Sequence, residues 1–263
     1  MLKKILPLLL CVLLLSACAS IDVPVPDTTA PTTLQTEETT EPTVETTAET
    51  KPLHSELYLP EYSVEQIIEY FNEVVLNVEY TDGTGDATLV QKWLFPIYYN
   101  VYGNPTDEDL AVLNDLFAQL NAVAGFPGIY PVSGMVQENL SISFFSPDVF
   151  RDEFSSVVNG EDAYGATQFW YYTDTNELYH GRIGHRTDIP QTERSSIIVE
   201  EIINTLGITD TVLREDSIVY QYSNENLTLS DVDWVILKLL YDPAIESGMD
   251  KDACEAVIRQ LYY

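Results

Sequence analysis

The sequence predicts an α+β domain behind a long polar leader, and two observations support this class. Amphipathic segments of helical period and short aromatic or β-branched segments are mixed along residues 58–263, without regular βαβ alternation. A stretch of about 200 residues is also long enough to bury one core, and it shows no internal repeat. We therefore expect a single domain that combines a sheet with a helical C-terminal part.

Residues 1–17 have the pattern of an export signal. Lys3 and Lys4 precede the apolar run Ile5–Leu15, which is too short to span a bilayer, and Leu15-Ser16-Ala17-Cys18 matches a bacterial lipobox. This order predicts a mature chain that begins at a lipidated Cys18 and is anchored to the extracytoplasmic face of the cell membrane. An ordinary secretory signal with a chance cysteine is the alternative.

Residues 18–57 are expected to form a tether. From Thr28 to Pro52 the sequence consists mainly of Thr, Glu and Pro, with too few bulky apolar residues to offset the entropy of ordering. About 40 residues in a polyproline-like conformation reach roughly 120 Å, so the tether holds the domain away from the membrane.

Charge and cysteine content exclude several classes of partner. The net charge of −30 argues against nucleic acid and against an anionic lipid surface as partners. Once Cys11 leaves with the signal and Cys18 is lipidated, Cys254 is the remaining cysteine. A disulfide within the domain and a cysteine-based metal site are therefore not expected.

In the first half of the domain, side-chain periodicity predicts two helices and a strand. Ser63 with Gln66 forms a capping-box pattern for a helix to about residue 78. The aromatic and β-branched run 93–101 predicts a strand. Thr106 with Asp109 opens a second helix, which we expect to continue to residue 124 because Gly125 and Pro127 follow.

The second half is predicted to contain a strand, a hairpin and three helices. Residues 140–145 alternate as in a strand, and 167–172 and 177–184 form a hairpin pattern around residues 174–176. A helix is expected over about 193–206, with Gly207 just after its end. Thr228 with Asp231 is predicted to cap a helix that ends near Tyr241, and the last helix covers 250–262.

The helix that ends at Gly207 carries the most informative pattern. Zinc proteases of the metzincin type have His-Glu-x-x-His-x-x-Gly-x-x-His, in which the histidines bind zinc and the glutamate activates water. In that frame Glu200, Asn204 and Asp210 occupy the three ligand positions, and Glu201 occupies the position of the base. Zinc in hydrolases prefers histidine nitrogen, so we expect no zinc and no cofactor. The oxygen atoms of Glu200, Asn204 and Asp210 suit a hard cation better, but three such groups would bind it weakly.

Further motifs follow this helix in order. They are Ser217-Ile218-Val219-Tyr220, where Val219 stands in place of the turn methionine of metzincins, then Leu227-Thr228-Leu229-Ser230-Asp231, Leu239-Leu240-Tyr241-Asp242-Pro243 and Gly248-Met249. Together they resemble the bacterial lipoprotein family DUF2927, most clearly over residues 165–263. The resemblance implies a zincin-like mixed sheet with an active-site-type helix, and it implies no activity.

Basic residues cluster just before and within the same helix: His180, Arg182, His185, Arg186 and Arg194. In a zincin the strand before the active-site helix lines the cleft, so by analogy this basic cluster would face Glu200 and Glu201. We expect Arg194 or Arg186 to neutralise a half-buried Glu200, because buried carboxylates need a partner. In the alternative, the arginines and His185 bind an anionic, peptide or cell-wall ligand.

Aromatic residues are also concentrated in the predicted strands. Residues 169–172 are Phe-Trp-Tyr-Tyr, and Tyr98, Tyr99 and Tyr102 lie in the first predicted strand. Strand alternation sends about half of them into the core. The others can form a stacking surface for a glycan or a peptide.

The sequence therefore favours a surface-tethered binding or accessory module over an enzyme. The competing hypothesis is a divergent hydrolase or metallopeptidase, with Glu201 as general base and the arginines as electrostatic stabilisers. A purely structural partner protein, without a pocket at the helix, is the third possibility.

Overall fold

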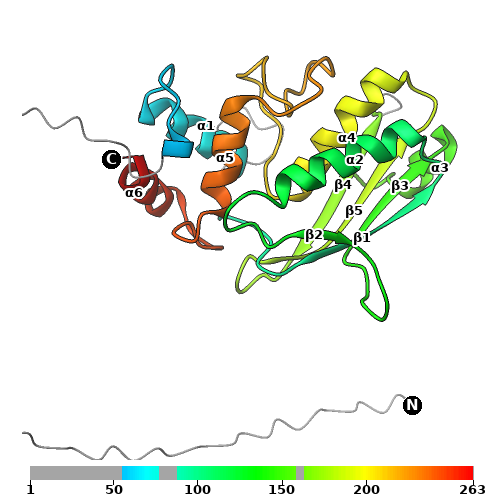
Figure 1. Ribbon diagram of the computed structural model, residues 1–263, viewed down its shortest axis with the longest axis horizontal. Helices are drawn as coiled ribbons and strands as arrows, with labels where there is room; N and C mark the ends of the chain where they lie inside the picture. Colours follow the sequence, from blue (N-terminus) through cyan, green and yellow to red (C-terminus); the bar gives the residue numbers. More distant parts are fainter. Residues whose placement is uncertain (1–54, 77–87, 158–162, 263) are drawn as a thin grey trace, which may run out of the picture. The chain divides into compact units, whose positions relative to one another are not determined.

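The computed structural model describes residues 55–76, 88–157 and 163–262, all of which lie in one compact unit, Glu49–Tyr263. These residues form six α-helices and a five-stranded mixed sheet, so the predicted α+β class is confirmed (Figure 1). The export signal, Cys18 and the tether up to residue 54 lie outside the described residues. The lipid anchor and the domain boundaries therefore stay predictions.

The sheet has the order β2-β1-β3-β5-β4. Its strands are β1 (Ile97–Gly103), β2 (Ile129–Pro131), β3 (Leu140–Phe145), β4 (Gly165–Tyr171) and β5 (Leu178–Arg186). Neighbours are parallel except for β4 and β5, which form the predicted hairpin. The unit β1–α2–β2 is a parallel crossover that the sequence pattern did not reveal, because β2 has only three residues.

The helices agree with most of the predicted segments. They are α1 (Val64–Leu76), α2 (Asp107–Leu120), α3 (Pro147–Glu153), α4 (Gln191–Thr205), α5 (Asp231–Tyr241) and α6 (Lys251–Tyr262), preceded by the short 3-10 helix η1 (Ser55–Leu57). The capping boxes predicted at α1 and α2 are confirmed: Ser63 and Gln66 bond reciprocally, as do Thr106 and Asp109. Neither β2 nor α3 was predicted.

Two predicted boundaries are wrong for local reasons. The first strand begins at Ile97 rather than residue 93, because the indole nitrogen of buried Trp93 donates to the carbonyl of Thr205 over 2.9 Å. Helix α2 ends at Leu120 rather than residue 124. The side chain of Asn121 bonds both the main-chain nitrogen and the carbonyl of Ile129, at 2.7 and 2.9 Å, and so turns the chain into β2.

The cap of α5 also differs from the prediction. Ser230 caps this helix with Asp233, in place of Thr228 with Asp231. Asp233 is buried, and its carboxylate accepts the main-chain N–H of Ile218 at 3.0 Å and lies 2.8 Å from the hydroxyls of Tyr70 and Ser217. These tertiary bonds decide which of two overlapping cap patterns forms.

Helices α2 and α4 lie together on one face of the sheet (Figure 1). The short helix α3 packs on the opposite face, where Phe154 would contact any side chain at Gly184. Helix α1 packs against α5 and α6. The sheet therefore has one face covered by two long helices and another that α3 covers at one end.

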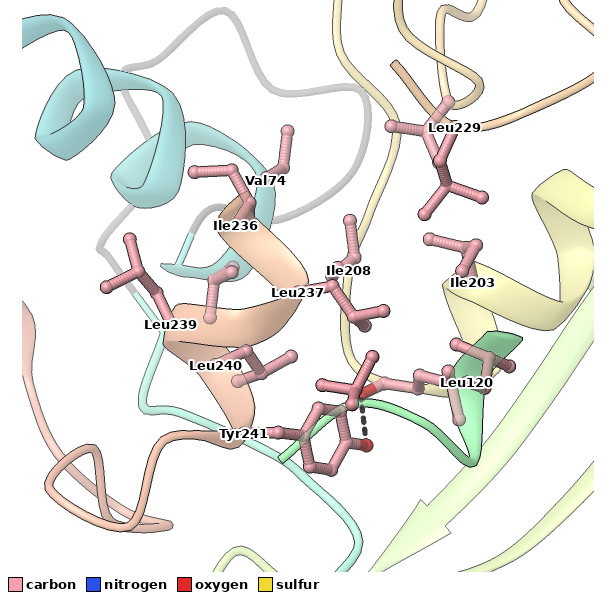
Figure 2. Packing of buried hydrophobic residues seen from close by; sticks show 14 of the residues in the cluster. Val74, Leu120, Ile203, Ile208, Leu229, Ile236, Leu237, Leu239, Leu240 and Tyr241 are labelled. Carbon is pink, nitrogen blue, oxygen red and sulfur yellow. Dashed lines mark hydrogen bonds between the residues drawn. The ribbon is translucent and has the colours of Figure 1, made fainter. Parts of the chain in front are cut away.

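The main core joins α5 to the end of α4 (Figure 2). Leu237 and Leu240 of α5 are fully buried, as are Leu120 of α2 and Ile203 of α4. The hydroxyl of buried Tyr241 donates to the carbonyl of Leu206 over 3.0 Å. Burial of these side chains fixes the position at which α4 ends and the following segment begins.

The C-terminal end of α5 is held by a buried amine. Nζ of Lys92 donates to the carbonyl of Leu240 in the last turn of the helix and to those of Asp242 and Ile245 just beyond it. Burial lowers the pKa of Lys92 to about 8. Cys254 of α6 is fully buried nearby, and burial, with Asp250 adding to it, raises the pKa of its thiol to about 11.

Candidate functional site

The turn after α4 brings the chain back towards the last turn of that helix. Gly207 has a φ of +99°, and a side chain there would lie 2.1 Å from the carbonyl oxygen of Gln91. The next residues are buried or half-buried, and the main-chain nitrogen of Thr209 donates to the carbonyl of Val74 at the end of α1 over 2.7 Å. This contact directs Asp210 towards the last turn of α4.

Two of the three predicted ligand positions contact each other. Nδ2 of Asn204 donates to Oδ1 of Asp210 over 3.1 Å, and both side chains are half-buried. Oδ1 of Asn204 is buried without a hydrogen-bond partner in the described part of the chain. Glu200 lies one helical turn earlier and is half-buried. Across 55–76, 88–157 and 163–262, no group of three or more His, Cys, Asp or Glu side chains is arranged to hold a metal ion.

The side chain of Glu201, in α4, lies against the edge strand β4. Its side chain is 8% exposed, and a Cβ at Gly165 would lie 2.6 Å from its Oε1, so the missing side chain of Gly165 makes room for this carboxylate. The carbonyl of Glu201 accepts the hydroxyls of Thr167 and Thr205, at 2.9 and 2.8 Å. A general base must come within hydrogen-bond reach of the proton it removes, and in this conformation Glu201 offers little surface to a substrate.

The predicted basic cluster is divided between the two faces of the sheet. Register places Ile183 and His185 of β5 on the face that carries α4, together with Gly181, which lies against Thr205. His180 and Arg182 point to the opposite face, where the guanidinium of Arg182 lies 4.4 Å from the ring centre of Phe154. The expectation that these residues face Glu200 as one group is therefore wrong.

Arg194 does not neutralise Glu200, so the first of the two predicted partners is wrong. Its Nε donates to Oδ1 of Asp109 in α2 over 2.9 Å, and both side chains are buried. Its other guanidinium nitrogens donate to Gln191 and to the carbonyls of Thr187 and Ile189. The remaining arginine of the prediction, Arg186, forms a two-pronged ion pair with Asp188, at 3.0 and 2.8 Å.

Asp109 is the partner of Arg194 that the sequence prediction missed. Burial raises the pKa of its carboxyl, but hydrogen bonds from Arg194, from Thr106 and from Gln191 outweigh burial, so the pKa is lowered. Asp109 thus both caps α2 and joins it to the first turn of α4. Its place in the Thr106 capping box was visible in the sequence, but its pairing with an arginine 85 positions away was not.

His185 is enclosed beside this ion pair. It has no exposed surface, its ring centre lies 5.0 Å from that of Phe144, and both ring nitrogens are buried without a hydrogen-bond partner among the described residues. Burial lowers its pKa to about 3, with Asp109 and Arg194 acting in opposite directions. In this conformation His185 is neutral and inaccessible, so it is poorly placed to bind a ligand.

A cavity of about 560 Å³ opens elsewhere, between η1, the end of α2 and α5. Leu57, Val123 and Trp234 contribute apolar walls, and Lys238 contributes a charged group. This volume is in the range of small-molecule sites. None of the predicted site residues lines this cavity, whose position the sequence did not signal.

The roles predicted for Glu200, Glu201, Asn204, Asp210, His185, Arg186 and Arg194 stay predictions, because geometry alone does not test binding. Within the described residues, no helix is long and apolar enough to cross a membrane. Cys18, the predicted site of lipidation, lies outside them.

Comparison with known proteins assigns the chain to a family. The sequence profile described as "Protein of unknown function (DUF2927)" matches residues 64–260, so it extends over β1 to β3 as well as over the segment where the motifs occur. The chain matches no curated protein. Because the profile covers the whole sheet and most of the helical part, the chain belongs to the DUF2927 family of proteins of unknown function.

Proposed function

We propose that this chain is a cell-envelope lipoprotein, anchored through Cys18, whose domain is a degenerate zincin-like scaffold that binds a partner and does not hydrolyse peptides. The single observation that carries the proposal is the contact between Asn204 and Asp210 at 3.1 Å. It brings together two positions that bind metal in the zinc-protease motif. Here an amide and a carboxylate occupy them and bond to each other.

Two further features support the same scaffold. Gly207 has the positive φ that a sharp turn after the helix requires, at the motif's glycine position. The segment Ser217–Tyr220 lies beside the returning chain: the main-chain nitrogen of Thr211 donates to the carbonyl of Val219 over 2.8 Å. Val219 is buried, so an apolar residue occupies the place of the turn methionine.

The chemistry of the three positions favours binding over hydrolysis. Carboxylate and amide oxygens bind zinc less well than imidazole does. Hydrolysis by a zinc enzyme depends on a tightly bound ion that lowers the pKa of the water molecule it binds. Glu201, at the base position, is buried against Gly165 of β4. We infer that Glu200 and Asn204 contribute polar contacts to a partner and that Glu201 has a structural role.

Metal analysis of the purified full chain tests the proposal. After incubation with zinc and with calcium and removal of free ions, we expect far less than one zinc per chain and no peptidase activity. Stoichiometric zinc together with peptidase activity that Glu201→Gln abolishes, and that the control Glu193→Gln on the same helix retains, would contradict it.

A rebuilt site tests the scaffold separately. The triple variant Glu200→His, Asn204→His and Asp210→His restores the ligands of the motif, so we expect it to bind one zinc ion through nitrogen, as X-ray absorption would report. A control with Glu193→His in place of Glu200→His should bind zinc more weakly. If the triple variant folds and gains no zinc affinity over this control, the positions do not converge as in a zincin.

The anchor has its own test. Cys18→Ser should move the protein from the membrane fraction to the soluble fraction and should abolish incorporation of a labelled fatty acid. Cys11→Ser, within the apolar run, is the matched control and should leave both unchanged. Unaltered fractionation of Cys18→Ser would contradict the lipoprotein assignment.

A further inference from the structure

The face of the sheet opposite α2 and α4 is partly open. Side chains that point to the helices are identified by their contacts: the ring centre of Tyr99 lies 4.6 Å from that of Phe117 in α2, and the hydroxyl of Thr167 donates to the carbonyl of Glu201 in α4. Their strand neighbours point the other way. On that face α3 covers the end near Gly184, whereas Tyr130 and Tyr102 are 46% and 44% exposed.

Two pairs of aromatic rings, with Asn139 between them, line up across this open face. Tyr130 of β2 pairs in register with Tyr98 of β1, and their ring centres are 6.4 Å apart. Trp170 of β4 pairs with His180 of β5, and these ring centres are 5.0 Å apart. Asn139 joins the two pairs, because its main-chain nitrogen bonds the carbonyl of Tyr98 and its carbonyl accepts from Gly181. The row therefore runs across the strands from one edge of the sheet to the other.

A second row, of hydrogen-bonding side chains, runs beside the first. Its members lie in register with one another, each two positions along its strand from a member of the first row: Asn100, Ser141, Arg182 and Gln168. Parts of it are held in place: Asn100 donates to Oε2 of Glu138 at 2.7 Å, as does the Tyr102 hydroxyl. Arg182 is fixed over Phe154 and lies 3.7 Å from Glu153. Rings and polar groups thus form two parallel, ordered rows.

We propose that this face binds a glycan chain laid across the strands. A sugar ring has an apolar face, which stacks on an aromatic ring, and hydroxyl edges, which need donors and acceptors alongside. The two rows offer this combination with side chains that lose little conformational freedom on binding. The inference goes beyond the proposed function, since the face lies on the other side of the sheet from α4.

Direction and charge favour a glycan over other polymers. An extended peptide gains affinity by pairing its main chain with a free sheet edge, whereas these rows cross the middle of the sheet, where the strands already pair. Nucleic acid is disfavoured by the net charge of −30. The same charge disfavours a polyanionic glycan, and the guanidinium of Arg182 on this face already lies 3.7 Å from Glu153, so the occupant we infer is a neutral glycan.

The test is a titration of the full chain with two probes, an N-acetylglucosamine oligomer, which is neutral, and an oligogalacturonate, which is anionic. Calorimetry should show saturable binding of the N-acetylglucosamine oligomer and weaker or no binding of the oligogalacturonate, because the net charge of −30 repels a polyanion. Trp170→Ala and Tyr98→Ala should each weaken binding about tenfold or more, which corresponds to one lost stacking contact. Trp170→Phe should retain most of it, and Tyr222→Ala, which removes a 70% exposed ring outside the face, should have no effect.

Arg182→Gln keeps a hydrogen-bonding side chain in the second row, so it should bind the N-acetylglucosamine oligomer with an affinity close to that of the unaltered chain. The proposal is overturned if the N-acetylglucosamine oligomer does not bind, if only the oligogalacturonate binds, or if Trp170→Ala and Tyr98→Ala bind as well as the unaltered chain while melting normally. Binding of an extended peptide and no glycan would overturn it as well. None of these outcomes depends on metal content, so failure here is distinct from failure of the zincin-like assignment.

Discussion

The two faces of the sheet differ in what their side chains contact. On the covered face, Leu140 and Ile142 have no exposed surface, and Gly165 and Gly181 let α4 approach closely. On the open face, the same strands present rings and polar groups that are partly exposed. Successive residues of one strand thus serve different purposes: one set stabilises the domain, and the other is available to a partner. Substitutions on the covered face should therefore affect stability, and those on the open face should affect binding.

The largest expected effect comes from the buried ion pair. Arg194→Ala leaves Asp109 charged and without its main partner in the interior, so the free energy of unfolding should fall by about 3–5 kcal/mol. Arg151→Ala removes an exposed pair with Asp148 in α3, on the other face, and should cost less than about 1 kcal/mol. Urea unfolding measures both; similar losses would remove this distinction between the faces.

Neighbouring residues of β3 give a sharper comparison. Leu140→Ala should lower the free energy of unfolding by about 2–5 kcal/mol, because it leaves a cavity beneath α4. Ser141→Ala, one residue along the strand on the open face, should change it by less than about 0.5 kcal/mol. If Ser141→Ala destabilises the protein as much as Leu140→Ala, the open face is packed against something in solution.

His185 makes the stability of the covered face depend on pH. Its folded pKa of about 3 lies below the unfolded value of about 6.5, so the unfolded chain binds more protons between these values. The contribution of His185 to the free energy of unfolding is fully present above pH 6.5 and is lost as the pH falls towards 3. Between pH 7 and pH 4 this loss is on the order of 3 kcal/mol. His185→Phe should flatten that part of the stability profile relative to the unaltered chain, whereas Phe144→Leu should keep the slope.

Gly165 tests how closely α4 approaches the sheet. In Gly165→Ala the new methyl group would lie 2.4 Å from Cγ2 of Ile197 and 2.6 Å from Oε1 of Glu201, so the helix must shift. We expect a loss of about 1–3 kcal/mol. Gln168→Ala, on the other face of β4, is the control and should stay within about 0.5 kcal/mol in thermal unfolding. A neutral Gly165→Ala would mean that Glu201 leaves this position easily.

The sequence predicted those elements that are specified by residues within them or next to them. The caps of α1 and α2, the alternation of β3 and the turn at Gly207 were all visible in the sequence. The missed elements are short: β2 has three residues and α3 has seven, too few to show a period. At α5 two cap patterns overlap, and bonds from Tyr70 and Ile218 to Asp233 select one of them.

The candidate site was predicted in part. The return of Asp210 to Asn204 followed from the motif and its glycine. The partner of Arg194 did not, because an ion pair between α2 and α4 depends on how the helices pack. The division of the basic cluster was open to prediction: His180 and Arg182 have even positions in β5 and His185 an odd one, so strand alternation separates them.

The buried thiol of Cys254 gives the protein an internal reporter of its own opening. It is the free cysteine of the described residues, it has no exposed surface, and its high pKa leaves almost no thiolate at neutral pH. A thiol reagent can therefore reach it only when α6 separates from the rest of the domain. The rate at which the reagent labels this sulfur, compared between variants of the two faces, measures how often the native structure opens, with no cysteine introduced.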